Sequence, residues 1–211
     1  MSRAYCYRCH RAKVACLCGR IDRYSNQVEI IVLQHPEETT NSKGSAIIAE
    51  LGLNRYKCWV SEDFQLHKGL MALLEEKAGT VAILYPTETS EVLEPERVEC
   101  VAADIKVLIV IDGTWRKARK IWELNPQLHT LPCYKLAVEQ KSDYRIRKAP
   151  LQSCLSTVES IVTALRLIEK RPQSYQRMLD LFAEMIDFQI QKMGKDTYIK
   201  NYSNKNEINE K

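Results

Sequence analysis

A carboxylate at the end of an apolar strand is the first feature that could do chemistry. Residues 107–111 read VLIVI, a run typical of a buried strand, and Asp112 follows at once. Gly113, Thr114 and Trp115 come next, and the helix they open carries the cations Arg116, Lys117, Arg119 and Lys120. An acid beside cations indicates a site for an anionic substrate. The structural alternative is that Asp112 or Thr114 caps the helix.

Four cysteines near the N-terminus have the spacing C-x2-C-x6-C-x-C. They are Cys6, Cys9, Cys16 and Cys18. Four thiolates suit a tetrahedral zinc ion, whereas four free thiols in so polar a segment would oxidise. The sequence therefore predicts a structural Zn2+ in a small N-terminal knuckle over residues 1–24.

Cations and aromatic rings surround these cysteines. Arg8, Arg11 and Lys13 alternate with Tyr5 and Tyr7. This combination suits RNA, which offers phosphates to cations and unpaired bases to stacking rings. The alternative is a solvated basic face that offsets the negative charge of a zinc–thiolate centre.

Polar residues beside other predicted elements are weaker candidates. His35 follows an apolar run and could bind substrate, although such a residue more often hydrogen-bonds a turn. Arg145 and Arg147 form another basic cluster. Residues 156–159 read STVE, a capping box that starts a helix. The N–H groups of a helix start can also bind a carboxylate or phosphate.

Apolar runs separated by helical patterns predict how these residues are positioned. The expected strands are 28–33, 56–60, 80–85, 106–111 and 133–138. The expected helices are 41–53, 66–77, 115–124, 156–170 and 174–193. Such a chain favours an α/β fold, with a mostly parallel sheet and helices on both faces. Ligands then bind beyond the carboxyl ends of the strands. We expect a main domain over 25–195 and a flexible polar tail over 196–211.

The bulk properties limit the possible functions. The chain has 211 residues, 45% of them hydrophobic, and a net charge of +4, which permits an RNA partner. No pair of glycines fits a GxGxxG motif or a P-loop, which disfavours a dinucleotide fold and an NTPase. We expect no membrane span and no signal peptide. The expected compartment is cytoplasmic, where structural disulfides are rare.

Four motifs in order resemble one known family. They are the cysteine pattern, QHPEE (34–38), DGTW (112–115) and LSTVES (155–160). The chain is similar in these motifs, over about residues 1–190, to the DTW-domain family, which is named for D-x-T-W. Ser160 stands where that family usually has alanine, and both residues are small.

The resemblance implies a fold and a reaction. The fold is SPOUT-like with a C-terminal trefoil knot. The reaction moves the 3-amino-3-carboxypropyl group of S-adenosylmethionine (S-adenosyl-L-methionine) to N3 of a tRNA uridine. It gives acp3U and releases methylthioadenosine. The variable loop of tRNA (position 47) is the expected target, and the D-loop is the alternative. Other interpretations are a SPOUT-type RNA methyltransferase and a non-catalytic zinc-knuckle RNA-binding protein. No obligate protein partner is implied, and a monomer is favoured over a dimer.

The resemblance also implies roles for individual residues. Asp112 is the expected catalytic base, or else it binds the amino group of the donor. The expected donor-binding residues are Tyr85, Pro86, Thr87, Asp112, Gly113, Thr114, Trp115, Leu155, Ser156 and Thr157. The expected RNA-binding residues are Arg8, Arg11, Lys13, His35, Arg116, Lys117, Arg145 and Arg147.

Overall fold

The protein folds around a parallel sheet of six strands in the order β4-β3-β7-β5-β8-β6. The computed structural model describes residues 4–94, 104–137, 142, 144–146 and 155–203, and the statements below concern these residues. The strands are β3 (Glu29–Gln34), β4 (Tyr56–Val60), β5 (Val81–Leu84), β6 (Glu91–Leu93), β7 (Val107–Asp112) and β8 (Cys133–Leu136). Every pairing in this sheet is parallel. The predicted parallel α/β fold is confirmed.

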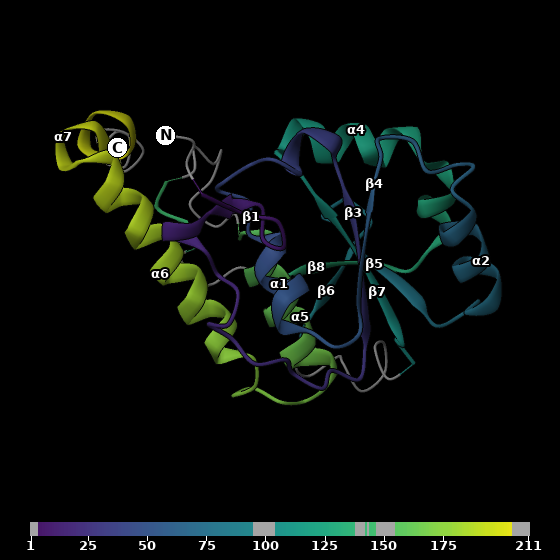
Figure 1. Ribbon diagram of the computed structural model, residues 1–211. Helices are drawn as coiled ribbons and strands as arrows, with labels where there is room; N and C mark the ends of the chain where they lie inside the picture. Colours follow the sequence, from purple (N-terminus) through teal and green to yellow (C-terminus); the bar gives the residue numbers. More distant parts are fainter. Residues whose placement is uncertain (1–3, 95–103, 138–141, 143, 147–154, 204–211) are drawn as a thin grey trace, which may run out of the picture.

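Helices cover both faces of the sheet, as Figure 1 shows. On one face lie α2 (Lys68–Glu76) and α4 (Trp115–Leu124), and on the other lie α1 (Ala46–Gly52) and α5 (Thr157–Ile168). Helix α6 (Gln176–Met193) packs against α1 and α5, and α7 (Lys195–Tyr198) follows it. Strand β6 was not predicted, because its three residues form no recognisable apolar run. Helix α1 begins at Ala46, later than the predicted residue 41, because a short 3-10 helix (Pro36–Glu38) and turns precede it.

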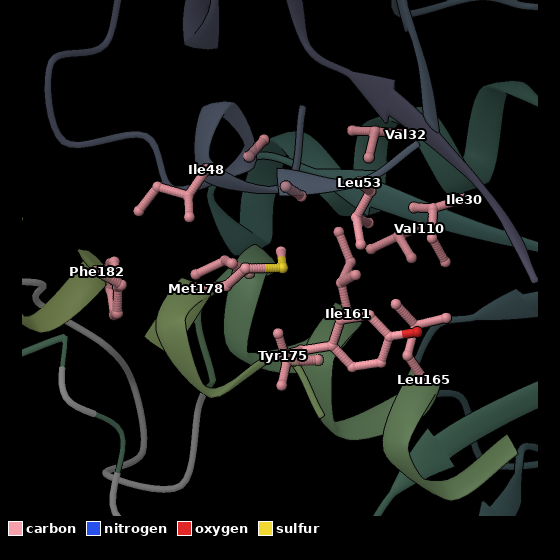
Figure 2. Packing of buried hydrophobic residues seen from close by; sticks show 14 of the residues in the cluster. Ile30, Val32, Ile48, Leu53, Val110, Ile161, Leu165, Tyr175, Met178 and Phe182 are labelled. Carbon is pink, nitrogen blue, oxygen red and sulfur yellow. The ribbon is translucent and has the colours of Figure 1, made fainter. Parts of the chain in front are cut away.

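The alternation of side chains along the central strands divides the core into two clusters. Ile109 and Ile111 of β7 belong to the cluster with α2 and α4. Leu108 and Val110 belong to the cluster with α1, α5 and α6, shown in Figure 2. Successive residues of a strand point to opposite faces. Asp112, two residues after Val110, therefore faces the same side as α5.

The N-terminal segment packs onto the main domain. Its two short strands, β1 (Tyr5–Cys6) and β2 (Arg11–Ala12), form an antiparallel pair. Cys6, Cys9 and Leu17 are buried in the cluster that contains α5 and α6. The knuckle thus shares its apolar contacts with the domain that carries the sheet.

The beginning of the C-terminal tail is helical. In the segment for which we expect a flexible tail, the chain continues as α7 and a π-helical turn (Ile199–Ser203). Tyr198 and Tyr202 pack against the core, and the Lys43 Nζ lies 3.0 Å from the Tyr202 hydroxyl. Residues 204–211 lie outside the described part. None of the described helices is both long and apolar enough to cross a bilayer. The trefoil knot stays a prediction, since residues 147–154 are not described.

Candidate active site

Asp112 lies at the carboxyl edge of the sheet, where two elements orient its side chain. Asp112 and Gln34 are register partners at the ends of β7 and β3. The Gln34 Nε2 donates a hydrogen bond to Asp112 Oδ2 at 2.8 Å. The Thr157 hydroxyl, at the start of α5, donates to Asp112 Oδ1 at 2.5 Å. The side chain is 6% exposed, so these contacts fix the direction in which the carboxylate points.

The residues after Asp112 allow α4 to start close to the strand. A Cβ on Gly113 would lie 3.0 Å from the Lys117 Cβ and 3.3 Å from the Ala118 nitrogen, so only glycine fits without a shift. Thr114 is the N-cap of α4, and its side chain accepts from the Lys117 N–H at 3.5 Å. The capping role considered for Asp112 therefore belongs to Thr114.

A cavity of about 440 Å³ adjoins this motif. This volume is within the usual range for a small-molecule site. Five predicted donor-binding residues line it: Asp112, Gly113, Thr114, Trp115 and Thr157. A second part of the wall comes from the segment between Glu38 and Ser45. The rest of the described lining is Arg116, Tyr144, Ile146 and Tyr202. Trp115 is 40% exposed, so much of its ring is accessible.

The predicted residues at the end of β5 do not line this cavity. Tyr85 is buried and stacks on Trp122, with ring centroids 4.9 Å apart. Thr87 donates its N–H to Ser90 Oγ at 2.8 Å. Pro86 is exposed between them. Trp122 packs against the core, as its helical spacing indicates.

The start of α5 is a complete capping box. The Ser156 hydroxyl accepts from the Glu159 N–H at 3.3 Å, and the Glu159 carboxylate accepts from the Ser156 N–H at 2.7 Å. Ser156 is fully buried, whereas Leu155 is partly exposed, and neither residue lines the cavity. The capping box fixes the start of α5, and this places the Thr157 hydroxyl within hydrogen-bonding distance of Asp112.

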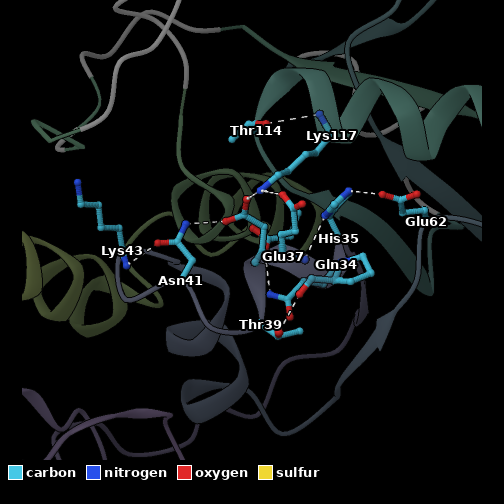
Figure 3. A network of polar contacts seen from close by, with 12 residues as sticks. Gln34, His35, Glu37, Thr39, Asn41, Lys43, Glu62, Thr114 and Lys117 are labelled. Carbon is cyan, nitrogen blue, oxygen red and sulfur yellow. Dashed lines mark hydrogen bonds and ion pairs between the residues drawn. The ribbon is translucent and has the colours of Figure 1, made fainter.

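Carboxylates pair with three of the four cations of α4. The Lys117 Nζ lies 2.7 Å from Glu38 Oε1 and 3.0 Å from Glu37 Oε2, and Figure 3 shows this network. The other pairs are Lys120 with Glu62 and Arg119 with Glu123. Arg116 is exposed, lines the cavity, and makes no ion pair with the described residues. Arg116 is therefore the cation of α4 best placed to bind a phosphate.

Lys117 connects α4 to the wall of the cavity. Burial lowers the pKa of Lys117, but hydrogen bonds to Glu38 and Glu37 outweigh it, so the pKa is raised. Glu38 is 8% exposed and also accepts from the Asn41 amide at 2.6 Å. This buried pairing favours a structural role for Lys117 over the predicted RNA contact.

Lys117→Met should therefore destabilise the protein. We expect a loss of about 2 kcal/mol, which is less than the roughly 3–5 kcal/mol typical of a fully buried pair because Asn41 still donates to Glu38. Urea unfolding measures the change. Arg116→Met, on the same helix, is the matched control and should unfold within about 0.5 kcal/mol of wild type. Equal stability of both variants would contradict the structural role.

His35 has a similar structural environment. It is 4% exposed, its Nδ1 accepts from the Glu37 N–H at 3.2 Å, and its Nε2 lies 2.6 Å from Glu62 Oε1. Both ring nitrogens contact the protein. The geometry therefore supports the turn-stabilising alternative rather than the predicted RNA contact.

The four cysteine sulfurs of the knuckle lie within 4.8 Å of one another. The Cys6 and Cys18 sulfurs are 3.8 Å apart, and the Cys9 and Cys16 sulfurs are 3.6 Å apart. Zn–S bonds of about 2.3 Å place the sulfurs of a tetrahedral site about 3.8 Å apart. The cluster therefore has the ligands and the size that fit zinc.

The predicted RNA-binding cations of the knuckle differ in exposure. Arg8 and Lys13 are exposed, and so is Tyr7, at 88%. Arg11 is only 5% exposed, and its guanidinium donates to the backbone oxygens of Ser42 and Gly44. Burial lowers the pKa of Arg11. Arg11 thus joins the knuckle to the cavity wall, which differs from its predicted role.

The last predicted cations are on the segment before α5. Arg145 is exposed and pairs with Asp187 of α6 at 2.6 Å. Arg147 lies outside the described residues. Sequence reasoning assigned no role to Gln34, although its place at the end of β3, one strand from Asp112, was the available signal.

Comparison with known proteins identifies the family. The DTW domain matches residues 3–190. The chain is 33% identical over 88% of its length to tRNA-uridine aminocarboxypropyltransferase 2 of Drosophila melanogaster, and covers 74% of that protein. It is 27% identical over 94% of its length to the protein of the same name from Macaca fascicularis, and covers 70% of it. It is 28% identical over 90% of its length to the protein of the same name from Mus musculus, and covers 64% of it. No solved structure gives a significant match. The chain belongs to the DTW-domain family.

Proposed function

We propose that the chain is a tRNA-uridine aminocarboxypropyltransferase that uses S-adenosylmethionine as donor. Family membership and the names of the relatives support this activity. The observation that carries the proposal is Asp112, a buried carboxylate oriented by Gln34 and Thr157 beside a cavity of about 440 Å³. The donor occupies this cavity, and Trp115 contacts it.

The reaction explains why a carboxylate is needed. The bond between uridine N3 and the transferred carbon forms as the bond from that carbon to sulfur breaks. The electron pair of the broken bond stays on sulfur, which leaves as the thioether of methylthioadenosine. N3 carries a proton at neutral pH, and a base must take it. Asp112 is that base, and Gln34 and Thr157 hold its oxygens in place.

The four cysteines hold a structural zinc ion. The spacing of their sulfurs supports this assignment. The ion is separate from the carboxylate that performs the reaction. Its binding free energy stabilises the fold of the knuckle, because the unfolded segment has no preformed site.

The exposed cations and ring of the knuckle bind tRNA. Arg8 and Lys13 contact phosphates, and Tyr7 stacks on an unpaired base. Arg116 contacts the backbone of the tRNA beside the donor cavity. The expected target is the uridine in the variable loop of the tRNA (position 47), and mass spectrometry of nuclease fragments locates the product.

Replacing Arg8 and Lys13 together with alanine should weaken tRNA binding. Each lost phosphate contact should lower the slope of log affinity against log salt by roughly 0.7–0.9. For the double variant, the slope of log tRNA affinity against log salt should thus be smaller in magnitude by about 1.5. Its affinity for S-adenosylmethionine should stay at the wild-type value. The control is Arg55→Ala with Lys106→Ala, two exposed cations at the opposite edge of the sheet. Identical slopes for both double variants would contradict a tRNA-binding knuckle.

The reaction products test the proposed activity against the alternatives. Incubation with the donor and tRNA should release methylthioadenosine and leave acp3U in the tRNA. A methyltransferase would release S-adenosylhomocysteine from the same donor. A non-catalytic RNA-binding protein would release neither compound.

A further inference from the structure

A second cavity, of about 590 Å³, lies between the knuckle and the edge of the sheet. Its walls include His10 and Arg11 of the knuckle, Glu50 of α1, and Tyr56 and Cys58 of the edge strand β4. Neither the reaction nor the proposed donor site described above uses this cavity. Its volume is within the range of sites that hold a small organic group.

The two cavities share a wall. Glu38, Asn41 and Gly44 line both of them. This segment is held from several sides, since Lys117 pairs with Glu38 and Arg11 donates to the backbone oxygen of Gly44 at 2.9 Å. The partition between the cavities is therefore a fixed part of the fold.

The cavities also meet at the candidate catalytic pair. Gln34 lines the second cavity, and its partner Asp112 lines the first. Gln34 donates through Nε2 to the carboxylate, and none of the described residues donates to its amide oxygen. A hydrogen-bond acceptor is thus available to a ligand in the second cavity.

The chemistry of the transfer requires two adjoining sites. In a displacement at carbon, the nucleophile approaches from the side opposite to the leaving sulfur, so acceptor and donor reach the carbon from different directions. An enzyme that acts on a base reaches it in single-stranded RNA or takes it out of its stack, and in both cases holds it in a pocket. The lining of the second cavity includes both Arg23, an exposed cation of the knuckle, and Gln34, which contacts Asp112.

We propose that the second cavity receives the acceptor uridine, and that Gln34 accepts a hydrogen bond from this nucleoside. This inference rests on the proposed function, because it assigns the second substrate of the same reaction. It places the meeting point of the two substrates beside Gln34 and Asp112, where the lining of one cavity joins that of the other. The knuckle then has a second role besides binding tRNA, since it forms one side of the acceptor site.

Photo-crosslinking tests this assignment directly. Once the modified position is mapped, a tRNA with 4-thiouridine there is irradiated in complex with the full-length protein. The crosslinked peptide should contain residues 46–60, from α1 through β4. A crosslink confined to α4 or to the start of α5 would overturn the proposal, because it would place the acceptor in the first cavity.

A variant that fills the second cavity provides a second measurement. Glu50→Trp should lower the single-turnover transfer rate at least tenfold, with the Kd for S-adenosylmethionine and the Kd for tRNA each within threefold of wild type. The matched control is Glu75→Trp, an exposed position on α2 at the other face of the sheet, which should react at the wild-type rate. A wild-type rate for Glu50→Trp would overturn the assignment. If wild-type protein forms no acp3U at all, the proposed function fails first, so the two failures are distinguishable.

Discussion

Asp112→Asn should remove nearly all transfer activity and leave a folded protein. A general base contributes a factor on the order of a hundred to ten thousand, so acp3U formation should fall by about that factor. The amide of asparagine cannot take the proton from N3. Single-turnover assays with saturating donor and tRNA measure the loss at the chemical step.

The environment of Asp112 explains why the fold should persist. An asparagine oxygen can still accept from the Gln34 amide, and its NH2 group can donate to Thr157, because a hydroxyl both donates and accepts. Both neighbours keep a partner. The expected change in the free energy of unfolding is about 1 kcal/mol, the net contribution of one hydrogen bond.

A matched variant separates this role from helix capping. Thr114→Ala removes the side chain that caps α4 and should cost about 1 kcal/mol of stability, with transfer reduced far less than in Asp112→Asn. Calorimetry with S-adenosylmethionine then distinguishes the two functional roles of Asp112, which are the catalytic base and a contact with the amino group of the donor. Weakened donor binding indicates a contact with the amino group, and unchanged binding indicates the base. Transfer within a few-fold of wild type in Asp112→Asn would reject both roles.

The sequence predicted the parts of this site that depend on local patterns. The apolar run 107–111 forms a strand together with Asp112, and all six residues are buried. A continuous apolar run of this length is typical of a strand buried on both faces. Parallel pairing then places the ends of β3 and β7 at one edge, which brings Gln34 to Asp112. The capping box at Ser156 is also local, and the structure confirms it.

The sequence did not predict contacts that depend on partners distant along the chain. Lys117 was predicted to bind phosphate, yet it meets Glu38, which lies 79 positions away. Arg11 was predicted to face RNA, but it meets backbone oxygens of a turn that only the folded knuckle brings near. A cation in a sequence has no visible partner, so its exposure must come from the tertiary structure.

Cys16→Ser should lose the zinc ion and unfold the knuckle while the sheet stays intact. The apparent binding free energy of a structural zinc is roughly 10–16 kcal/mol in isolated zinc fingers, and the fold of so small a segment depends on it. Freshly purified, reduced wild-type protein should contain about one zinc per chain. Cys133→Ser is the matched control, because Cys133 lies in β8 outside the cluster and should leave the metal in place.

The loss of zinc should also weaken the site for S-adenosylmethionine, although no cysteine of the cluster lines the donor cavity. The connection is Arg11, which is buried and donates to the backbone oxygens of Ser42 and Gly44 in the shared wall. When the knuckle unfolds, these carbonyls lose their donor and the wall loses a support. We expect donor affinity to fall about tenfold in Cys16→Ser. Arg11→Gln should show a similar fall with its zinc retained, whereas donor binding at wild-type strength in both variants would show that the knuckle and the donor cavity are independent.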